Sequence, residues 1–154
     1  MFSPAKAIRD WLKAPYVGMP DAPKFLLGTD QGGKVTAVTL YDTGGPQGGN
    51  PDHRITTPTF MVRVRARDYS DGYALASVLH SKLLYARNLV LEGARFTYFS
   101  TLTAPAFINK DDQEYHIFTF NIQTMLTLTS NPTGGLLWAG GIKWAGGVTW
   151  AKGA

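Results

Sequence analysis

Cysteine is absent from the 154 residues, so the fold contains no disulfide bond, thiolate metal site or thiol nucleophile. Charge is also scarce, because charged residues make up 17% of the chain while hydrophobic residues make up 44%. A surface poor in charge leaves apolar patches, which often mark contact sites for other molecules. The net charge of +4 permits contact with nucleic acid without requiring it. This composition predicts one globular domain that associates with partners.

Long apolar runs are lacking as well. No window approaches the roughly 20 apolar residues of a membrane-spanning helix. Near the N-terminus, Lys6, Arg9 and Asp10 interrupt the sequence before any apolar stretch that could serve as a secretory signal. We therefore expect no membrane contact and a soluble intracellular product.

Catalytic and metal-binding motifs are equally hard to find. His53, His80 and His116 are too far apart for a zinc motif, and no Gly-x-Ser-x-Gly elbow occurs. Residues 28–34 have the glycine and lysine spacing of a phosphate-binding P-loop, but Val35 stands where a hydroxyl should hold magnesium. We predict no enzymatic activity, cofactor or metal. A dispersed Ser-His-Asp triad is the remaining catalytic alternative.

Two helices are predicted from caps and apolar periodicity. Ser3 followed by Pro4 is a helix start, because the serine side chain caps the first amides and the fixed φ of proline suits the first turn. A second helix is predicted over residues 71–87, capped by Ser70 and carrying an apolar stripe. His80 lies off that stripe, so we expect it to face solvent.

Strands are predicted where apolar and polar residues alternate, at residues 25–27, 35–41, 60–67, 95–103 and 115–128. The glycine- and proline-rich segment 42–58 is predicted to be a long loop, which in a compact domain is usually functional or mobile. Strands grouped between helices predict an α+β fold, with an antiparallel (mixed) sheet of four to five strands and two helices packed on it.

The strand at 60–67 carries three arginines on one face. Arg63, Arg65 and Arg67 alternate with apolar residues and stand about 6.5–7 Å apart along an extended backbone. One interpretation is the solvated outer face of an antiparallel sheet. The other is a contact surface for phosphates, or for carboxylates of a neighbour, which the planar guanidinium suits.

The last residues change character, so the chain divides into a domain at 1–131 and a Gly/Trp-rich arm at 132–154. Trp138, Trp144 and Trp150 each begin a six-residue unit. Because six is even, an extended backbone would point all three to one side. The arm either folds back on its own domain as a strand or hairpin, or inserts its tryptophans into pockets of a partner.

Several short motifs in the middle of the chain follow one another in a characteristic order. These motifs are Val38-Thr39-Leu40-Tyr41-Asp42-Thr43-Gly44-Gly45, Pro58-x-x-x-Val62-Arg63-Val64-Arg65, Tyr69-x-x-x-Tyr73, Gly93-Ala94-Arg95-Phe96, Pro105, Asp112 and Phe120-Asn121. In their order and spacing, residues 5–125 resemble the tail terminator proteins of long-tailed bacteriophages, which are also called tail completion or minor capsid proteins.

The resemblance implies an α+β subunit of a homo-hexameric ring. Such a ring caps the tail tube, ends its elongation and offers the surface for head–tail joining, while DNA passes through the lumen without sequence-specific binding. The implied partners are further copies of the chain, the tail tube protein and a connector or neck protein. The implied location is the tail or neck of the virion.

The resemblance also suggests roles for individual residues. The arginine strand becomes a candidate for the lumen or a subunit interface, and the tryptophan arm, which departs from the family pattern, a candidate for binding a subunit or neck protein. The loop becomes a candidate for contact with a neighbouring ring through Tyr41, Asp42, Gly44, Gly45, His53 and Arg54.

Other functions are compatible with the same residues. Another neck or head-completion adaptor would share the virion and the ring symmetry. A nucleic-acid-binding domain using Arg63, Arg65 and Arg67 would show salt-dependent affinity for free DNA or RNA as a monomer. A carbohydrate binder would use the tryptophans of the arm.

Overall fold

The computed structural model describes residues 2–29, 33–45 and 55–128. The Gly/Trp-rich arm and residues 46–54 lie outside the described residues. The elements in chain order are α1 (Pro4–Lys13), the short 3-10 helix η1 (Ala14–Tyr16), β1 (Lys24–Leu27), β2 (Ala37–Gly44), β3 (Ile55–Thr56), β4 (Thr59–Ala66), α2 (Tyr69–Tyr85), β5 (Arg87–Leu91), β6 (Ala94–Lys110) and β7 (His116–Leu128).

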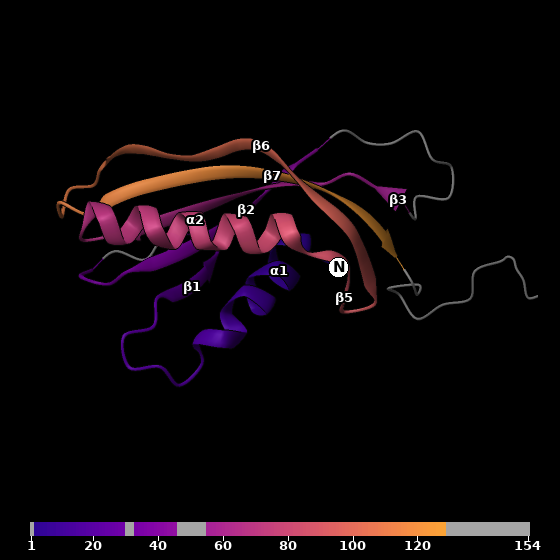
Figure 1. Ribbon diagram of the computed structural model, residues 1–154, viewed down its shortest axis with the longest axis horizontal. Helices are drawn as coiled ribbons and strands as arrows, with labels where there is room; N and C mark the ends of the chain where they lie inside the picture. The colour runs from indigo at the N-terminus through magenta and orange to yellow at the C-terminus, as the bar shows by residue number, and fades with distance from the viewer. Residues whose placement is uncertain (1, 30–32, 46–54, 129–154) are drawn as a thin grey trace, which may run out of the picture.

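The strands form one mixed sheet of seven strands in the order β1-β2-β4-β7-β6-β5, with β3 also paired to β7. β1 and β2 are parallel, and the other pairs are antiparallel. The sheet is curved, and both helices lie on the same side of it (Figure 1). The predicted α+β class is confirmed, and the sheet has two more strands, β3 and β5, than the sequence predicted.

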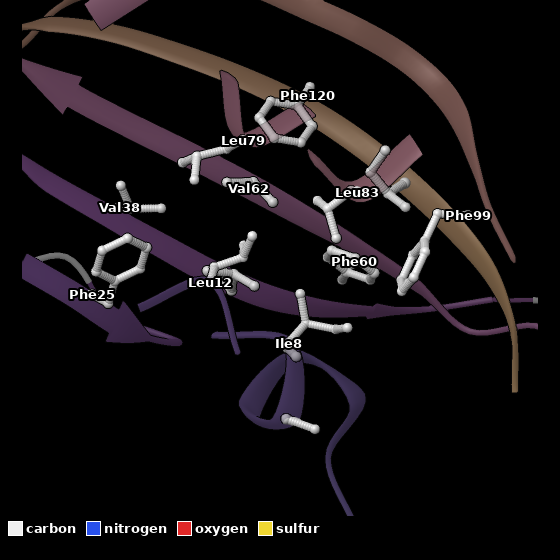
Figure 2. Packing of buried hydrophobic residues seen from close by; sticks show 14 of the residues in the cluster. Ile8, Leu12, Phe25, Val38, Phe60, Val62, Leu79, Leu83, Phe99 and Phe120 are labelled. Atoms are coloured by element: carbon white, nitrogen blue, oxygen red, sulfur yellow. The ribbon is translucent and has the colours of Figure 1, made fainter. Parts of the chain in front are cut away.

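The core lies between the two helices and one face of the sheet. Phe60, Val62 and Val64 of β4 are fully buried on that face, as the alternation predicted. Figure 2 shows side chains of both helices lying beside Phe60 and Val62. The helices contribute the buried Ile8, Leu12, Leu79 and Leu83.

Helix α1 is fastened at its start by polar contacts from distant strands. The Ser3 side chain accepts from the Lys6 N–H at 3.1 Å, which confirms the predicted cap. The carboxylate of Asp42 accepts from the Ser3 hydroxyl at 2.7 Å and from the Ala5 N–H at 3.0 Å. Lys6 reaches the Glu92 carboxylate at 3.2 Å. The helix is thus tied both to β2 and to the turn between β5 and β6.

Helix α2 differs from the prediction at both ends. It begins at Tyr69 after the N-cap residue Asp68, rather than after Ser70, and it ends at Tyr85. The following residues form β5, which pairs with β6 through a tight turn. Glu92 and Gly93 in that turn have φ values of 50° and 78°, the left-handed conformation that two-residue hairpin turns use.

The expectation that His80 faces solvent is only partly right, because its side chain is half-buried. Its ring packs edge-on against Phe120 with centroids 5.2 Å apart, and its Nε2 lies 2.6 Å from the Thr101 hydroxyl. Helix α2 lies across β6 and β7, so a residue beside the apolar stripe still meets the sheet. Burial accordingly lowers the pKa of His80.

The long loop predicted at 42–58 is shorter than expected. β2 continues to Gly44 because Asp42 pairs with Phe60 and Gly44 with Thr59 across the ladder to β4. At the other end, Ile55–Thr56 forms β3 on β7. Pairing with a neighbouring strand therefore overrides the low strand propensity of glycine.

Candidate assembly interface

The three arginines of β4 have different surroundings. Arg63 is partly buried and pairs across the ladder with Thr39 and Thr119. Arg65 is 5% exposed, and its guanidinium is engaged within the subunit. It donates to the Asp111 carboxylate, to the carbonyl oxygens of Gly33 at 2.7 Å and Val35 at 2.9 Å, and to the Gln113 side-chain oxygen at 3.0 Å.

Arg65 thereby holds the hairpin tip, defined as residues 110–116 between β6 and β7. Its guanidinium stacks 4.0 Å above the Tyr115 ring. The Asp111 carboxylate also accepts from the N–H groups of Gln113 at 2.8 Å and Tyr115 at 3.0 Å. Burial raises the pKa of Asp111, but the hydrogen bond from Arg65 and those from the two amides outweigh it, so that pKa lies below its ordinary value. Arg65 therefore stabilises this turn, and its guanidinium is almost fully buried within the chain.

Arg67 lines a basic pocket beside the hairpin tip, with a volume of about 400 Å³. Lys110 in this pocket pairs with Glu114 at 3.2 Å, and His116 Nδ1 lies 3.0 Å from the Arg67 carbonyl oxygen. Its lining therefore contains three cations and one carboxylate, which suits an anionic group such as a phosphate or a partner's carboxylate. The basic pocket is lined by Lys34, Arg67, Lys110, Gln113, Glu114, Tyr115 and His116.

The residues predicted to lie in the loop occupy β2 and its end. Tyr41 is partly buried within the strand, and Asp42 binds the start of α1 as described above. Gly44 and Gly45 have φ values of 88° and 125°. A Cβ at Gly45 would lie 2.5 Å from the Thr57 carbonyl oxygen, so this position requires glycine. The remaining predicted residues lie outside the described residues: His53, Arg54, Trp138, Trp144 and Trp150.

The outer half of β6, residues 101–110, is unusual because solvent reaches both of its faces. All its residues except Pro105 are exposed, including the apolar Leu102 and Ile108 at 51% and 55%. β5 pairs with β6 only up to Tyr98, so the outer half is an open sheet edge within the described part of the chain. Exposed strand edges bearing apolar side chains are typical places for another chain to bind.

An aromatic cluster lies where α2 begins, next to the hairpin tip. The Tyr69 ring lies 5.4 Å from Phe107, 5.6 Å from His116 and 5.1 Å from Phe118, measured between centroids. Tyr69 and Phe107 are both exposed. Exposed aromatic side chains that are held rigidly by neighbours are frequent anchors of protein–protein contacts.

The described residues offer neither a metal site nor a membrane-spanning helix. Over residues 2–29, 33–45 and 55–128, no group of three or more histidine, aspartate or glutamate side chains is placed to hold a metal ion. In the same described portion, neither helix has the length and apolar character needed to span a bilayer.

The fold and these surfaces define an α+β domain with an open strand edge, an exposed aromatic cluster and a basic pocket. The model of the bacteriophage tail terminator protein family matches residues 18–128, the whole stretch from before β1 to the end of β7. The chain belongs to this family, which confirms the resemblance read from its motifs. It is therefore a structural protein of a phage tail.

Other comparisons add little. No curated protein matches the chain. A solved structure titled only with a sequence identifier covers 82% of this chain and 92% of its own length, at 20% identity and a TM-score of 0.48. Likeness at that level carries no argument about fold or function.

Proposed function

We propose that this protein forms a homo-hexameric ring that caps the tail tube, ends tube elongation and provides the surface for head–tail joining. The observation that carries the proposal is the family match over the entire sheet. Its partners are further copies, the tail tube protein and a connector or neck protein, and it resides in the virion neck after assembly in the host cytoplasm. Ending a polymer requires binding its end while offering no equivalent end, so surface shape is sufficient and no catalysis is involved.

The surfaces described above supply the contacts that a ring needs. Closed rings use heterologous interfaces, in which one patch of each copy binds a different patch of the next. We assign the open edge of β6 and the aromatic cluster to protein contacts. We assign Arg67 of the basic pocket, with Arg63 on the same face, to a subunit interface or to the lumen through which DNA passes without sequence-specific binding.

Loss of the gene provides the test of tube termination. Phage lacking this protein should produce tails of irregular and excessive length, and supplying the protein in trans should restore uniform tails. Negative-stain images of the purified protein, alone or with tail tubes, should show rings. Tails of normal length in the absence of the protein would contradict the proposal.

The Gly/Trp-rich arm is proposed to bind an adjacent subunit or neck protein. Deleting residues 132–154 should leave the melting temperature nearly unchanged, because an arm that binds a partner does not contribute to the core of its own domain. The deletion should reduce the yield of joined heads and tails. The matched control is a full-length variant in which Trp138, Trp144 and Trp150 are changed to alanine. This variant keeps the arm and lacks only its tryptophan side chains. If the deletion unfolds the domain, the arm belongs to the core and this role is wrong.

The nucleic-acid-binding alternative is weakened because Arg65, the middle residue of the arginine strand, makes its contacts within the chain. A DNA contact by the arginine strand would need three free guanidinium groups, whereas that of Arg65 is bound to Asp111 and to the loop before β2. A gel-shift series with the purified monomer at increasing salt distinguishes the two functions. Tight, strongly salt-dependent binding would favour the alternative.

A further inference from the structure

β1 forms one border of the sheet. The N–H groups of Lys24 and Gly28 donate to carbonyl oxygens bordering and within β2, at 2.9 and 2.8 Å. In a parallel ladder the intervening residues point their backbone groups the other way, so those of Phe25 and Leu27 face outward. No further strand pairs with β1 in the described part of the chain. An edge of this kind can accept another strand.

The opposite border of the sheet is the outer half of β6. Its ladder with β7 contains a register shift that spans Pro105, between Thr103 and Ala106, and another between Phe107 and Asn109. Such irregularities and a proline stop a long edge from acting as a template for unlimited strand addition. Between Pro105 and the hairpin tip lies one short stretch, residues 106–109, which contains the second of these shifts. This stretch is close in length to β1, which has four residues.

The pairing registers of the ladders place these two borders at the same level of the sheet. The pairs can be followed across the sheet from one strand to the next. Starting from Lys24, the first residue of β1, the paired residues are Ala37 in β2, Arg65 in β4, Ile117 in β7 and Asn109 in β6. Starting from Leu26, the third residue of β1, they are Thr39, Arg63, Thr119 and Ala106 in the same strands. β1 therefore lies level with residues 106–109 of β6.

Ring symmetry converts this shared level into a contact. Copies in a closed ring are related by rotation without translation along the axis. When the strands run nearly parallel to that axis, β1 of one copy meets β6 of the next copy at the same level. β1 is parallel to β2, and three antiparallel steps separate β2 from β6, so β1 and β6 run in opposite directions. The contact is then an antiparallel strand pair.

The side chains around both borders fit this pairing. The connector leading into β1 exposes Val17 and Met19 at 71% and 55%, and β6 exposes Phe107 and Ile108. Joining the borders covers apolar surface on both sides. In the pairing of β1 with β6 of the next copy, Lys24 lies opposite Asn109, which carries no charge.

Charge also fits at the end of the pair. In the antiparallel direction, the chain that precedes β1 in one copy continues past Asn109 to the hairpin tip of the other. This brings the exposed Asp21, three residues before Lys24, towards the basic pocket with its Arg67 and Lys110. A carboxylate is one of the anionic groups that the pocket suits.

We propose that β1 of one copy of this chain adds as an antiparallel strand to residues 106–109 of β6 in a second copy, with Asp21 at the basic pocket. The inference rests on the proposed ring and names the interface that closes it. Two different borders of one sheet form a heterologous contact, which repeats around the ring until no border is left open.

Cysteine cross-linking tests this interface without background, because the chain has no cysteine. Leu26→Cys and Ala106→Cys are introduced together into the full-length protein. Within one subunit four strand spacings separate them, about 19 Å, whereas a disulfide needs Cα atoms within about 7 Å. Oxidation of assembled rings and of purified tails should give covalent oligomers up to the full ring, which return to monomer on reduction.

Two further variants make the result specific. The control pair Leu26→Cys and Thr101→Cys moves one cysteine five residues along the same edge, roughly 16 Å out of register, and should remain monomeric. Ile108→Lys places a charge on the edge and should raise the concentration needed for ring formation by about tenfold or more with little change in melting temperature.

The outcomes separate the interface from the function. Rings or tails in which the Leu26–Ala106 pair stays uncross-linked overturn the interface and leave the ring proposal intact. Equal cross-linking of the Thr101 control overturns the register. Tails of normal length without the protein overturn the proposed function itself.

Discussion

Replacing Arg65 by alanine is the sharpest single test of how the sheet end is built. The substitution leaves the Asp111 carboxylate, whose side chain is 23% exposed, without its cation. It also removes the donor from the carbonyl oxygens of Gly33 and Val35. Breaking a buried pair from one side costs about 3–5 kcal/mol, and the partial exposure of Asp111 favours the lower figure, about 3 kcal/mol. For a chain of this size that corresponds to a fall in melting temperature of roughly 10 °C.

The measurement is thermal and urea unfolding followed by circular dichroism, with Arg67→Ala as the matched control. Arg67 is exposed and should change stability by less than about 0.5 kcal/mol. Adding Asp111→Asn gives a double-mutant cycle, in which the two positions should couple by about 1 kcal/mol or more. If Arg65→Ala is as mild as Arg67→Ala, the guanidinium does not hold the hairpin tip, and the assignment of Arg65 to structure is wrong.

Two other predictions concern α2. Gly72→Ala should destabilise the protein by about 1–2 kcal/mol, although alanine has the better helix propensity. The reason is that the new Cβ would lie 2.6 Å from the buried Phe118 ring and 3.1 Å from the Ala66 Cβ. A raised urea midpoint would refute this close approach. Burial lowers the pKa of His80, so its contribution to stability is complete above its ordinary value of 6.5 and declines as pH falls from there towards the folded-state pKa. His80→Gln should therefore flatten the melting temperature between about pH 7 and 5, and an unchanged profile would count against the burial of the ring.

Local signals in the sequence predicted the elements that carry strong periodicity or caps. Ser3 and Pro4 mark the start of α1, and the alternation along β4 places Phe60, Val62 and Val64 in the core. The sequence also contains a signal for the turn at Glu92 and Gly93 that the prediction did not use, because a glycine between two apolar stretches often marks a hairpin turn.

The remaining features depend on contacts that no local pattern contains. Periodicity assigned Arg65 to the face away from the helices, but it could not show that the loop before β2 and the hairpin tip cover that face. The outer half of β6 lacks an apolar alternation because neither of its faces is buried in the subunit. The basic pocket joins Lys34, Arg67 and Lys110 from three separate segments, so only the folded chain brings them together.

The attachment of α1 has a consequence for the order in which the chain folds during translation. Ala5 hydrogen-bonds to a carboxylate 37 residues further on, and Lys6 to one 86 residues further on. A ten-residue helix is marginally stable in water by itself. Helix α1 therefore cannot be locked in place until the ribosome has also released Glu92, and meanwhile Ile8 and Leu12 need shelter from premature association.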